Sequence, residues 1–319
     1  MQRLLITLTV LLFAAYTCVF LYMFDGGPPS GGQVAEVSVV INGPLNKYWD
    51  QVKRGMDQAA SDLGAELVFD TLVTDHSAAE QGELIGRELD GGTKAFVIAP
   101  AAGDTVMKRV LGGVSEKAVI VACGSRMGSG LADASVSADN RAMGEALGER
   151  IVAYERFRPG ILIITDGSGT ESELSRLLGL TSVLSRAGAR YSVRVVPPGT
   201  RDMAGRVAAY ALTENARTVV ALNSVTLTAA GEAFSANPHR ARVYGADSSP
   251  DIVSLLEKRV ITCVVAQNAY LLGYLSVESA VAELRGKRAD AVVPVGCAVI
   301  TANNMYTKEH ERLLFPFGR

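Results

Sequence analysis

The stretch VSVVINGPLNKYWDQVKRGMDQAASDLGAELVF, residues 37–69, decides the fold of this chain. It opens with the β-branched run 37–41, which is typical of a strand covered on both faces. Apolar residues then recur at the helical period, at Trp49, Val52, Met56, Ala60 and Leu63. Asn46 and Gly64 stand where a helix N-cap and a helix stop belong. The stretch predicts a strand, a turn, an amphipathic helix and a second strand.

The same alternation of strand and helix continues along the chain. Further strands are expected at 94–99, 118–122 and 134–137 and, after a restart at Asp139 and Asn140, at 160–164, 191–196, 218–222, 242–245, 260–266 and 291–300. Helices are expected between them, and such alternation predicts parallel sheets with right-handed crossovers. We therefore expect an α/β fold of two Rossmann-like, doubly wound lobes, with a ligand cleft between them.

The amino terminus predicts a membrane segment. Residues 4–24 carry no charge and lie between Arg3 and Asp25, and about 1.5 Å per residue lets them span roughly 30 Å. The following DGGPP offers no small-x-small cleavage site, and Tyr16 makes a poor lipobox before Cys18. An uncleaved transmembrane anchor is therefore favoured over a cleaved signal helix. Because Arg3 should stay in the cytoplasm, the rest of the chain is expected outside, after a tether at 26–33.

Composition excludes several classes of protein. The chain is 48% hydrophobic and 20% charged, so it can bury real cores. Its net charge of −2, with both signs interspersed, argues against nucleic-acid binding. The histidines, His76, His239 and His310, are scattered, as are the four cysteines. No metal or cofactor is therefore expected.

Three cysteines, Cys123, Cys263 and Cys297, lie in apolar strand-like runs and are expected to be buried. The sequence leaves open a disulfide among them. No catalytic motif accompanies them: the turn Gly167-Ser168-Gly169 fits neither GxGxxG nor GxSxG and is interpreted as a flexible turn. The protein is not expected to be an enzyme, although an enzyme using the same cleft is kept as a third hypothesis.

Polar and aromatic side chains gather after the strands of both halves, at the edge where ligands of open α/β sheets bind. They are Asn46, Tyr48, Trp49, Arg126 with Ser125, Arg176, Asn223 with Ser224, Asp247, and Gln267 with Asn268. Carboxylate, guanidinium and amide groups pair with sugar hydroxyls, and aromatic rings cover the C–H faces of a sugar. Each residue also has a structural interpretation: Asn46 as an N-cap, Trp49 as core, Arg176 as a solvated charge, Asn223 and Asp247 as turn formers.

From residue 37 to about 301 the chain resembles the type I periplasmic binding proteins, especially the ribose/galactose-binding group. The resemblance is carried by NKYW at 46–49, GTKAFVIAP at 92–100, SADN at 137–140, RLLG at 176–179, ALNS at 221–224, YGAD at 244–247 and AQ at 266–267. One departure is that CGSR at 123–126 lacks the carboxylate that sugar binders of this group have after the fourth strand. Ser224 also replaces the usual Asp.

The resemblance implies ligand contacts from Asn46, Tyr48, Trp49, Arg176, Asn223, Asp247 and Gln267, with Arg126 also in reach of the cleft. It implies a three-strand hinge; the anchor and tether expected above occupy residues 1–33. The N-terminal lobe would hold 34–137 plus 268–292, and the C-terminal lobe 138–267 plus 293–319. Related repressors begin with a helix-turn-helix, which the membrane segment replaces here, so DNA binding is not expected.

The function that the resemblance implies is capture of a sugar or sugar-like polyol by hinge closure, on the extracytoplasmic face of the membrane or in the periplasm. The closed form would be presented to the permease of an ABC transporter. The alternative is a membrane-anchored sensor that signals sugar occupancy to a histidine kinase or chemoreceptor. Neither role needs a cofactor, and the sequence does not identify the sugar.

Overall fold

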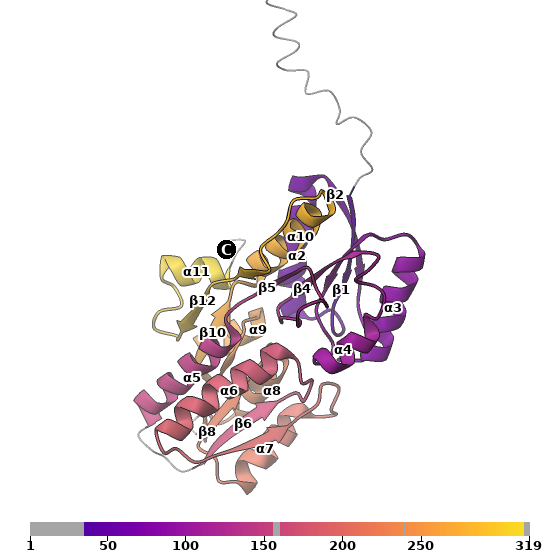
Figure 1. Ribbon diagram of the computed structural model, residues 1–319. Helices are drawn as coiled ribbons and strands as arrows, with labels where there is room; N and C mark the ends of the chain where they lie inside the picture. The colour runs from indigo at the N-terminus through magenta and orange to yellow at the C-terminus, as the bar shows by residue number, and fades with distance from the viewer. Residues whose placement is uncertain (1–34, 156–159, 239, 316–319) are drawn as a thin grey trace, which may run out of the picture. The chain divides into compact units, whose positions relative to one another are not determined.

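Figure 1 shows the computed structural model, which describes residues 35–155, 160–238 and 240–315. The opening stretch folds as predicted, into β1 (Ala35–Val40), α2 (Lys47–Leu63) and β2 (Ala65–Asp70). The side-chain oxygen of Asn46 accepts hydrogen bonds from the backbone N–H groups of Tyr48 and Trp49, both at 3.0 Å, so the predicted N-cap is confirmed. Gly64 ends the helix in the left-handed conformation, with φ of 62°.

The first sheet has six parallel strands in the order β11-β5-β4-β3-β1-β2. Its other elements are β3 (Ala95–Ile98), β4 (Val119–Cys123), β5 (Ala134–Ser137), β11 (Val292–Pro294), α3 (Ala78–Asp90), α4 (Asp104–Val110) and α10 (Ala269–Leu284). Helices α2 and α10 pack on one face and α3 and α4 on the other, each pair over its own apolar core (Figure 1).

The second sheet also has six strands, in the order β12-β10-β9-β8-β6-β7. Its elements are α5 (Asn140–Glu155), β6 (Ile161–Thr165), α6 (Glu171–Arg186), β7 (Tyr191–Val195), α7 (Met203–Thr213), β8 (Thr218–Ala221), α8 (Ser224–Phe234), β9 (Arg242–Ala246), α9 (Pro250–Glu257), β10 (Ile261–Gln267), β12 (Cys297–Ile300) and α11 (Lys308–Leu314). Helices α5 and α6 cover one face, and α7, α8 and α9 cover the other. The predicted α/β fold with two parallel sheets is confirmed, except that β12 runs antiparallel to β10.

The strand predicted at 291–300 is wrong as a single strand. Its first part, β11, pairs with β5 in the first sheet, and its second part, β12, pairs with β10 in the second. Between them Val295 donates to the carbonyl of Ser137 at 3.0 Å, and the carbonyl of Gly296 accepts from Asn268 at 3.3 Å. Val293 and Pro294, expected in the C-terminal lobe, therefore lie in the first sheet. The chain passes between the sheets after β5, after β10 and between β11 and β12.

Each sheet carries one pair of closely packed helices whose contact depends on glycine. A Cβ on Gly144 of α5 would collide with the carbonyl oxygen of Arg176, and a Cβ on Gly179 of α6 with that of Arg141. Gly55 of α2 and Gly273 of α10 meet the facing backbone in the same way. Since the α5–α6 pair holds the backbone of Arg176, this glycine contact fixes where the Arg176 side chain begins.

The predicted anchor and tether at 1–33 lie outside the described residues. Among the residues that are described, no helix is long and apolar enough to cross a membrane. Cys123 and Cys263 are buried as predicted, whereas Cys297 is exposed, because it begins the short β12 at the crossing between the sheets. All three are free thiols, and burial raises the pKa of Cys123 to about 12 and that of Cys263 to about 11.

Candidate functional site

A cavity of about 90 Å³ lies between the loops at the carboxyl ends of the strands of the two sheets. The first sheet and its loops contribute Asn42, Asn46, Tyr48, Trp49, Asp75, His76, Cys123 and Ser125. The second contributes Asp166, Thr170, Ser172, Glu173, Arg176, Asn223, Ser224, Asp247 and Gln267. Most of these side chains are polar or charged, so the cavity is built to hydrogen-bond a small molecule.

Seven of the eight residues predicted to contact a ligand line this cavity; Arg126 does not. Its side chain is exposed, and its Nε lies 3.5 Å from Oγ of Ser137. Its backbone N–H donates to Glu171 at 3.2 Å, so it meets the second lobe through its main chain. The structure therefore gives no support to Arg126 as a ligand contact. The ligand role of the other seven stays a prediction.

Arg176 is the most constrained cation of the site. Its side chain is 4% exposed, so its interpretation as a solvated helix charge is wrong. Its Nε donates to Oδ1 of Asn140 at 2.9 Å, and its Nη1 donates to the carbonyl of Leu222 and to Oδ2 of Asp247, both at 2.8 Å. Burial opposes its charge, but the Asp247 carboxylate outweighs this, and the pKa of Arg176 is raised.

A second chain of hydrogen bonds starts at Asp247, which follows β9 in the left-handed conformation with φ of 75°. Its Oδ1 accepts from Nε2 of Gln267 at 2.8 Å, and the same Nε2 lies 3.0 Å from the hydroxyl oxygen of Tyr48. Because a carboxylate only accepts, this bond fixes which way the Gln267 amide points. The other amide atom, Oε1 of Gln267, is left buried without a hydrogen-bond partner. Burial and then the Asp247 charge raise the pKa of Tyr48 far above its usual value, so the phenol stays neutral.

The aromatic and amide residues keep both of the roles that the sequence left open. Tyr48 and Trp49 are each 8% exposed and meet edge to face at 5.4 Å, as part of the core and of the cavity wall. Asn46 caps α2 and lines the cavity. Asn223 caps α8 through the Thr226 N–H at 2.9 Å, and its Nδ2 donates to Oδ2 of Asp166 at 2.5 Å.

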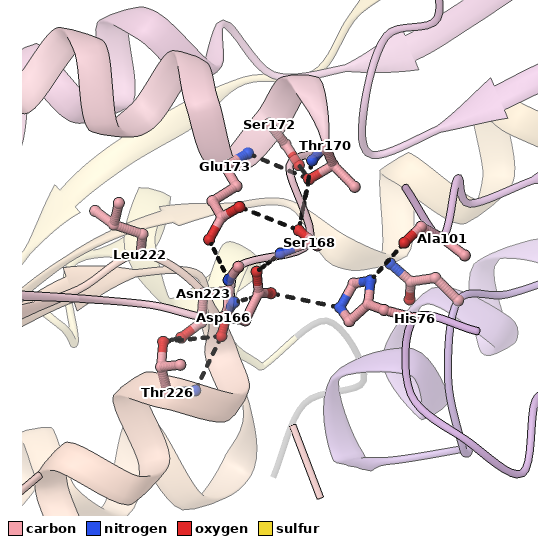
Figure 2. Close-up of polar contacts among 12 residues, drawn as sticks. His76, Ala101, Asp166, Ser168, Thr170, Ser172, Glu173, Leu222, Asn223 and Thr226 are labelled. Carbon is pink, nitrogen blue, oxygen red and sulfur yellow. Dashed lines mark hydrogen bonds and ion pairs between the residues drawn. The ribbon is translucent and has the colours of Figure 1, made fainter. Parts of the chain in front are cut away.

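Sequence reasoning missed an acidic group in the cavity wall, Asp166 with Glu173 (Figure 2). Asp166 directly follows β6 and accepts from the Ser168 N–H at 2.9 Å. Glu173 accepts from the N–H groups of Gly167 and Gly169, both at 2.8 Å, so the turn interpreted as flexible is tied to a carboxylate. Asp166 and Asn42 could have been found, because each follows a strand at its carboxyl end.

His76 joins the two lobes at this acidic group, as Figure 2 shows. Its Nδ1 lies 3.1 Å from the carbonyl oxygen of Ala101, and its Nε2 lies 3.4 Å from Oδ2 of Asp166. Both neighbours are acceptors, so both nitrogens are satisfied only in the imidazolium form. Burial opposes that form, but the hydrogen bond and charge of Asp166 outweigh it and raise the pKa of His76. No sequence pattern predicted this contact, since a turn separates His76 from β2.

The pKa values of two carboxyl groups near His76, those of Asp166 and Glu173, are shifted in opposite directions. Burial raises the pKa of Glu173, and the nearby Asp166 charge adds to the effect. Burial also opposes ionisation of Asp166, but the His76 contact outweighs it and lowers the pKa of Asp166. Within the described ranges, no group of three or more His, Cys, Asp or Glu side chains is placed to hold a metal ion.

Comparison with known proteins places this fold in a family. Residues 37–288 match the periplasmic binding protein domain, which is more than half of the chain. The ribose import binding protein RbsB of Haemophilus influenzae is 22% identical over 272 residues, which cover 83% of this chain and 91% of that protein.

Two solved structures are similar in fold. One is the solute-binding protein of a carbohydrate transporter from Agrobacterium radiobacter, in complex with D-arabinose, with a TM-score of 0.80, 20% identity, and coverage of 88% of this chain and 99% of that one. The other is one chain of the XylFII–LytSN complex, with a TM-score of 0.76, 16% identity, and coverage of 85% and 99%.

These similarities confirm the resemblance to type I periplasmic binding proteins and the expectation of a solute-binding protein rather than an enzyme. The matched segment covers five strands of each sheet, all but β11 and β12, and every predicted ligand residue from Asn46 to Gln267. The chain belongs to the periplasmic binding protein family.

Proposed function

We propose that this protein captures a sugar or sugar-like polyol in the cavity between its lobes and presents it to the permease of an ABC transporter. The observation that carries the proposal is the buried network of Arg176, Asp247, Gln267 and Tyr48. It leaves Oε1 of Gln267 without a donor, and an unpaired buried acceptor costs about 1–3 kcal/mol. A ligand hydroxyl that donates to this oxygen would remove that cost, and a sugar or polyol brings such hydroxyl groups.

The ligand class is also supported by the relatives. RbsB is a ribose import binding protein, and the Agrobacterium radiobacter protein binds D-arabinose. The proposed ligand contacts are Asn46, Tyr48, Trp49, Arg176, Asn223, Asp247 and Gln267, all of which line the cavity. Here Tyr48 and Trp49 would cover the C–H face of a sugar ring, and the other five would pair with its hydroxyls.

Capture would proceed by closure about a hinge made of the three passages between the sheets. Two of them flank the site directly: β10 ends at Gln267, and the first passage leads to Asn140, which holds Arg176. A ligand that contacts both lobes stabilises the closed form in proportion to its extra contacts there. We propose that lobe boundaries follow these passages, near residues 138, 268 and 295.

A sensor role is the second candidate. A chain of similar fold occurs in the XylFII–LytSN complex, so a binding protein of this fold can assemble with a second protein. The uncharged run at 4–24 would tether this protein to the membrane, and a tether limits shuttling between a solute and a permease. Neighbouring genes separate the two roles: permease and ATPase genes favour import, whereas a histidine kinase gene favours sensing.

A thermal-shift screen of pentoses, hexoses and polyols on the full-length protein tests the proposal. Any true ligand raises the melting temperature with increasing concentration, because it binds only the folded state. Asp247→Ala should abolish the shift, whereas Asp57→Ala, at an exposed carboxylate that lines neither this cavity nor its neighbouring pocket, should keep it. If no sugar or polyol raises the melting temperature, the ligand class is wrong. Recovery of the sugar unchanged after incubation excludes turnover.

A further inference from the structure

One side of the seam between the lobes is sealed by direct contacts. There the Ser172 N–H donates to Oγ of Ser125 at 3.0 Å, and His76 meets Asp166 at 3.4 Å. Next to them, a Cβ on Gly103 would lie 2.5 Å from the carbonyl oxygen of Gly169, so the two backbones touch. These contacts narrow this side of the seam for a molecule held in the cavity.

The other side of the seam is hollow. A pocket of about 440 Å³ lies between the start of α2 and helices α7, α8 and α9. The ion pair of Lys47 with Asp251, at 2.6 Å, connects the two lobes at this pocket, with side chains 61% and 45% exposed. The pocket is therefore part of the same cleft, and its walls come from both lobes.

Cavity and pocket are adjacent, because Asn46, Tyr48, Ser224 and Val225 line both. At about 10–15 Å³ of free space for each water molecule, the cavity has room for roughly six to nine waters, which matches a single sugar ring. The pocket is several times larger. A molecule of one ring would leave it empty, whereas a longer molecule would reach it past Tyr48.

We infer that the outer pocket is a second subsite and that the ligand is a glycoside or disaccharide whose second unit occupies it; this rests on the proposed function. The lining suits such a unit. The carboxylates of Asp202 and Glu232 can accept hydrogen bonds from sugar hydroxyl groups, and Met203 and Val225 offer apolar surface to C–H groups. The contacts on the other side of the seam favour placing the second unit in this pocket.

Titration calorimetry on the full-length protein tests the inference with cellobiose, maltose, lactose and xylobiose, each against its component monosaccharides. At least one disaccharide should bind ten-fold or more tightly than its components. Thr228→Trp fills the pocket and should weaken that disaccharide at least ten-fold, with monosaccharide affinity changed by less than two-fold. Thr213→Trp is the matched control, because both threonine hydroxyls donate to the carbonyl four residues earlier at 2.8 Å and only Thr228 lines the pocket.

Glu232→Trp, at an exposed position of the same pocket, repeats the test should Thr228→Trp fail to fold. The inference is overturned if monosaccharides bind and disaccharides bind no better, or if filling the pocket weakens both classes equally. If neither monosaccharides nor disaccharides bind, the proposed function itself falls and the inference falls with it.

Discussion

Two acid–base pairs line the cavity, and they differ in what holds them. Arg176 and Asp247 both belong to the second lobe, and three further groups of the protein fix their positions: Asn140, the Leu222 carbonyl and Gln267. His76 and Asp166 come from different lobes and share one contact of 3.4 Å. The first pair is therefore prearranged whether or not the lobes close, whereas the second requires both closure and a proton on His76.

The largest expected effect comes from breaking the prearranged pair. Arg176→Ala leaves the Asp247 carboxylate buried without its cation, and removing one partner of a buried pair typically costs about 3–5 kcal/mol. Chemical denaturation of the full-length protein measures this loss in the free energy of unfolding. Arg141→Ala is the control, since its pair with Glu145 is exposed and should contribute less than about 1 kcal/mol.

A double variant shows whether the loss comes from the orphaned charge. Arg176→Ala with Asp247→Ala removes both members, so it should be more stable than Arg176→Ala alone. Were Arg176→Ala no less stable than Arg141→Ala, the pair would not hold the second lobe together.

Asn223 caps α8 and also donates to Asp166 of the His76–Asp166 pair, and two substitutions separate these two roles. Asn223→Ala removes both the cap of α8 and the donor to Asp166 and should cost about 1–2 kcal/mol in the free energy of unfolding. Asn223→Ser keeps a capping oxygen and removes only the donor, so it should cost less. Equal losses in the two variants would show that the amide donor, not the cap, accounts for the effect.

The difference between the pairs also explains what the sequence could reveal. Alternating strands and helices predicted both sheets, because apolar periodicity is local. Strand ends predicted Asp247 and Gln267, and the helix that opens the second half supplied Arg176. His76 was not predicted as a site residue, because it lies in a turn and its partner Asp166 lies 90 positions later in another lobe. Arg126 had the right type and place in the sequence, yet its side chain contacts Ser137 outside the cavity while Ser125 lines it.

The His76–Asp166 pair predicts that the stability of the folded protein depends on pH. The pKa of His76 is raised in the folded state, so its contribution to stability is complete below about pH 6.5 and is lost as the pH rises through the folded pKa. Asp75 and Glu173 face the same group, and their raised pKa values act in the same direction, at lower pH. Unfolding free energies measured from pH 5.5 to 8.5 should therefore fall with rising pH.

His76→Gln isolates the histidine from these neighbours. The variant should lose most of the slope between pH 6.5 and 8.5, because its amide does not titrate. Asp166→Asn should flatten the same range from the other side of the contact. A wild-type slope that survives in both variants would assign the pH dependence to groups outside this pair.

The smallest effect on the unfolding free energy is expected at a third ion pair, Lys47 with Asp251, which lies at the outer pocket. It connects the lobes as His76 and Asp166 do, but both side chains are largely exposed, and exposed pairs contribute about 0–1 kcal/mol. Lys47→Ala should therefore change the unfolding free energy by less than about 1 kcal/mol, and 0.5 M salt should reduce the difference further. A loss as large as that of His76→Gln at pH 6 would mean that joining the lobes, rather than burial, decides how much a pair contributes.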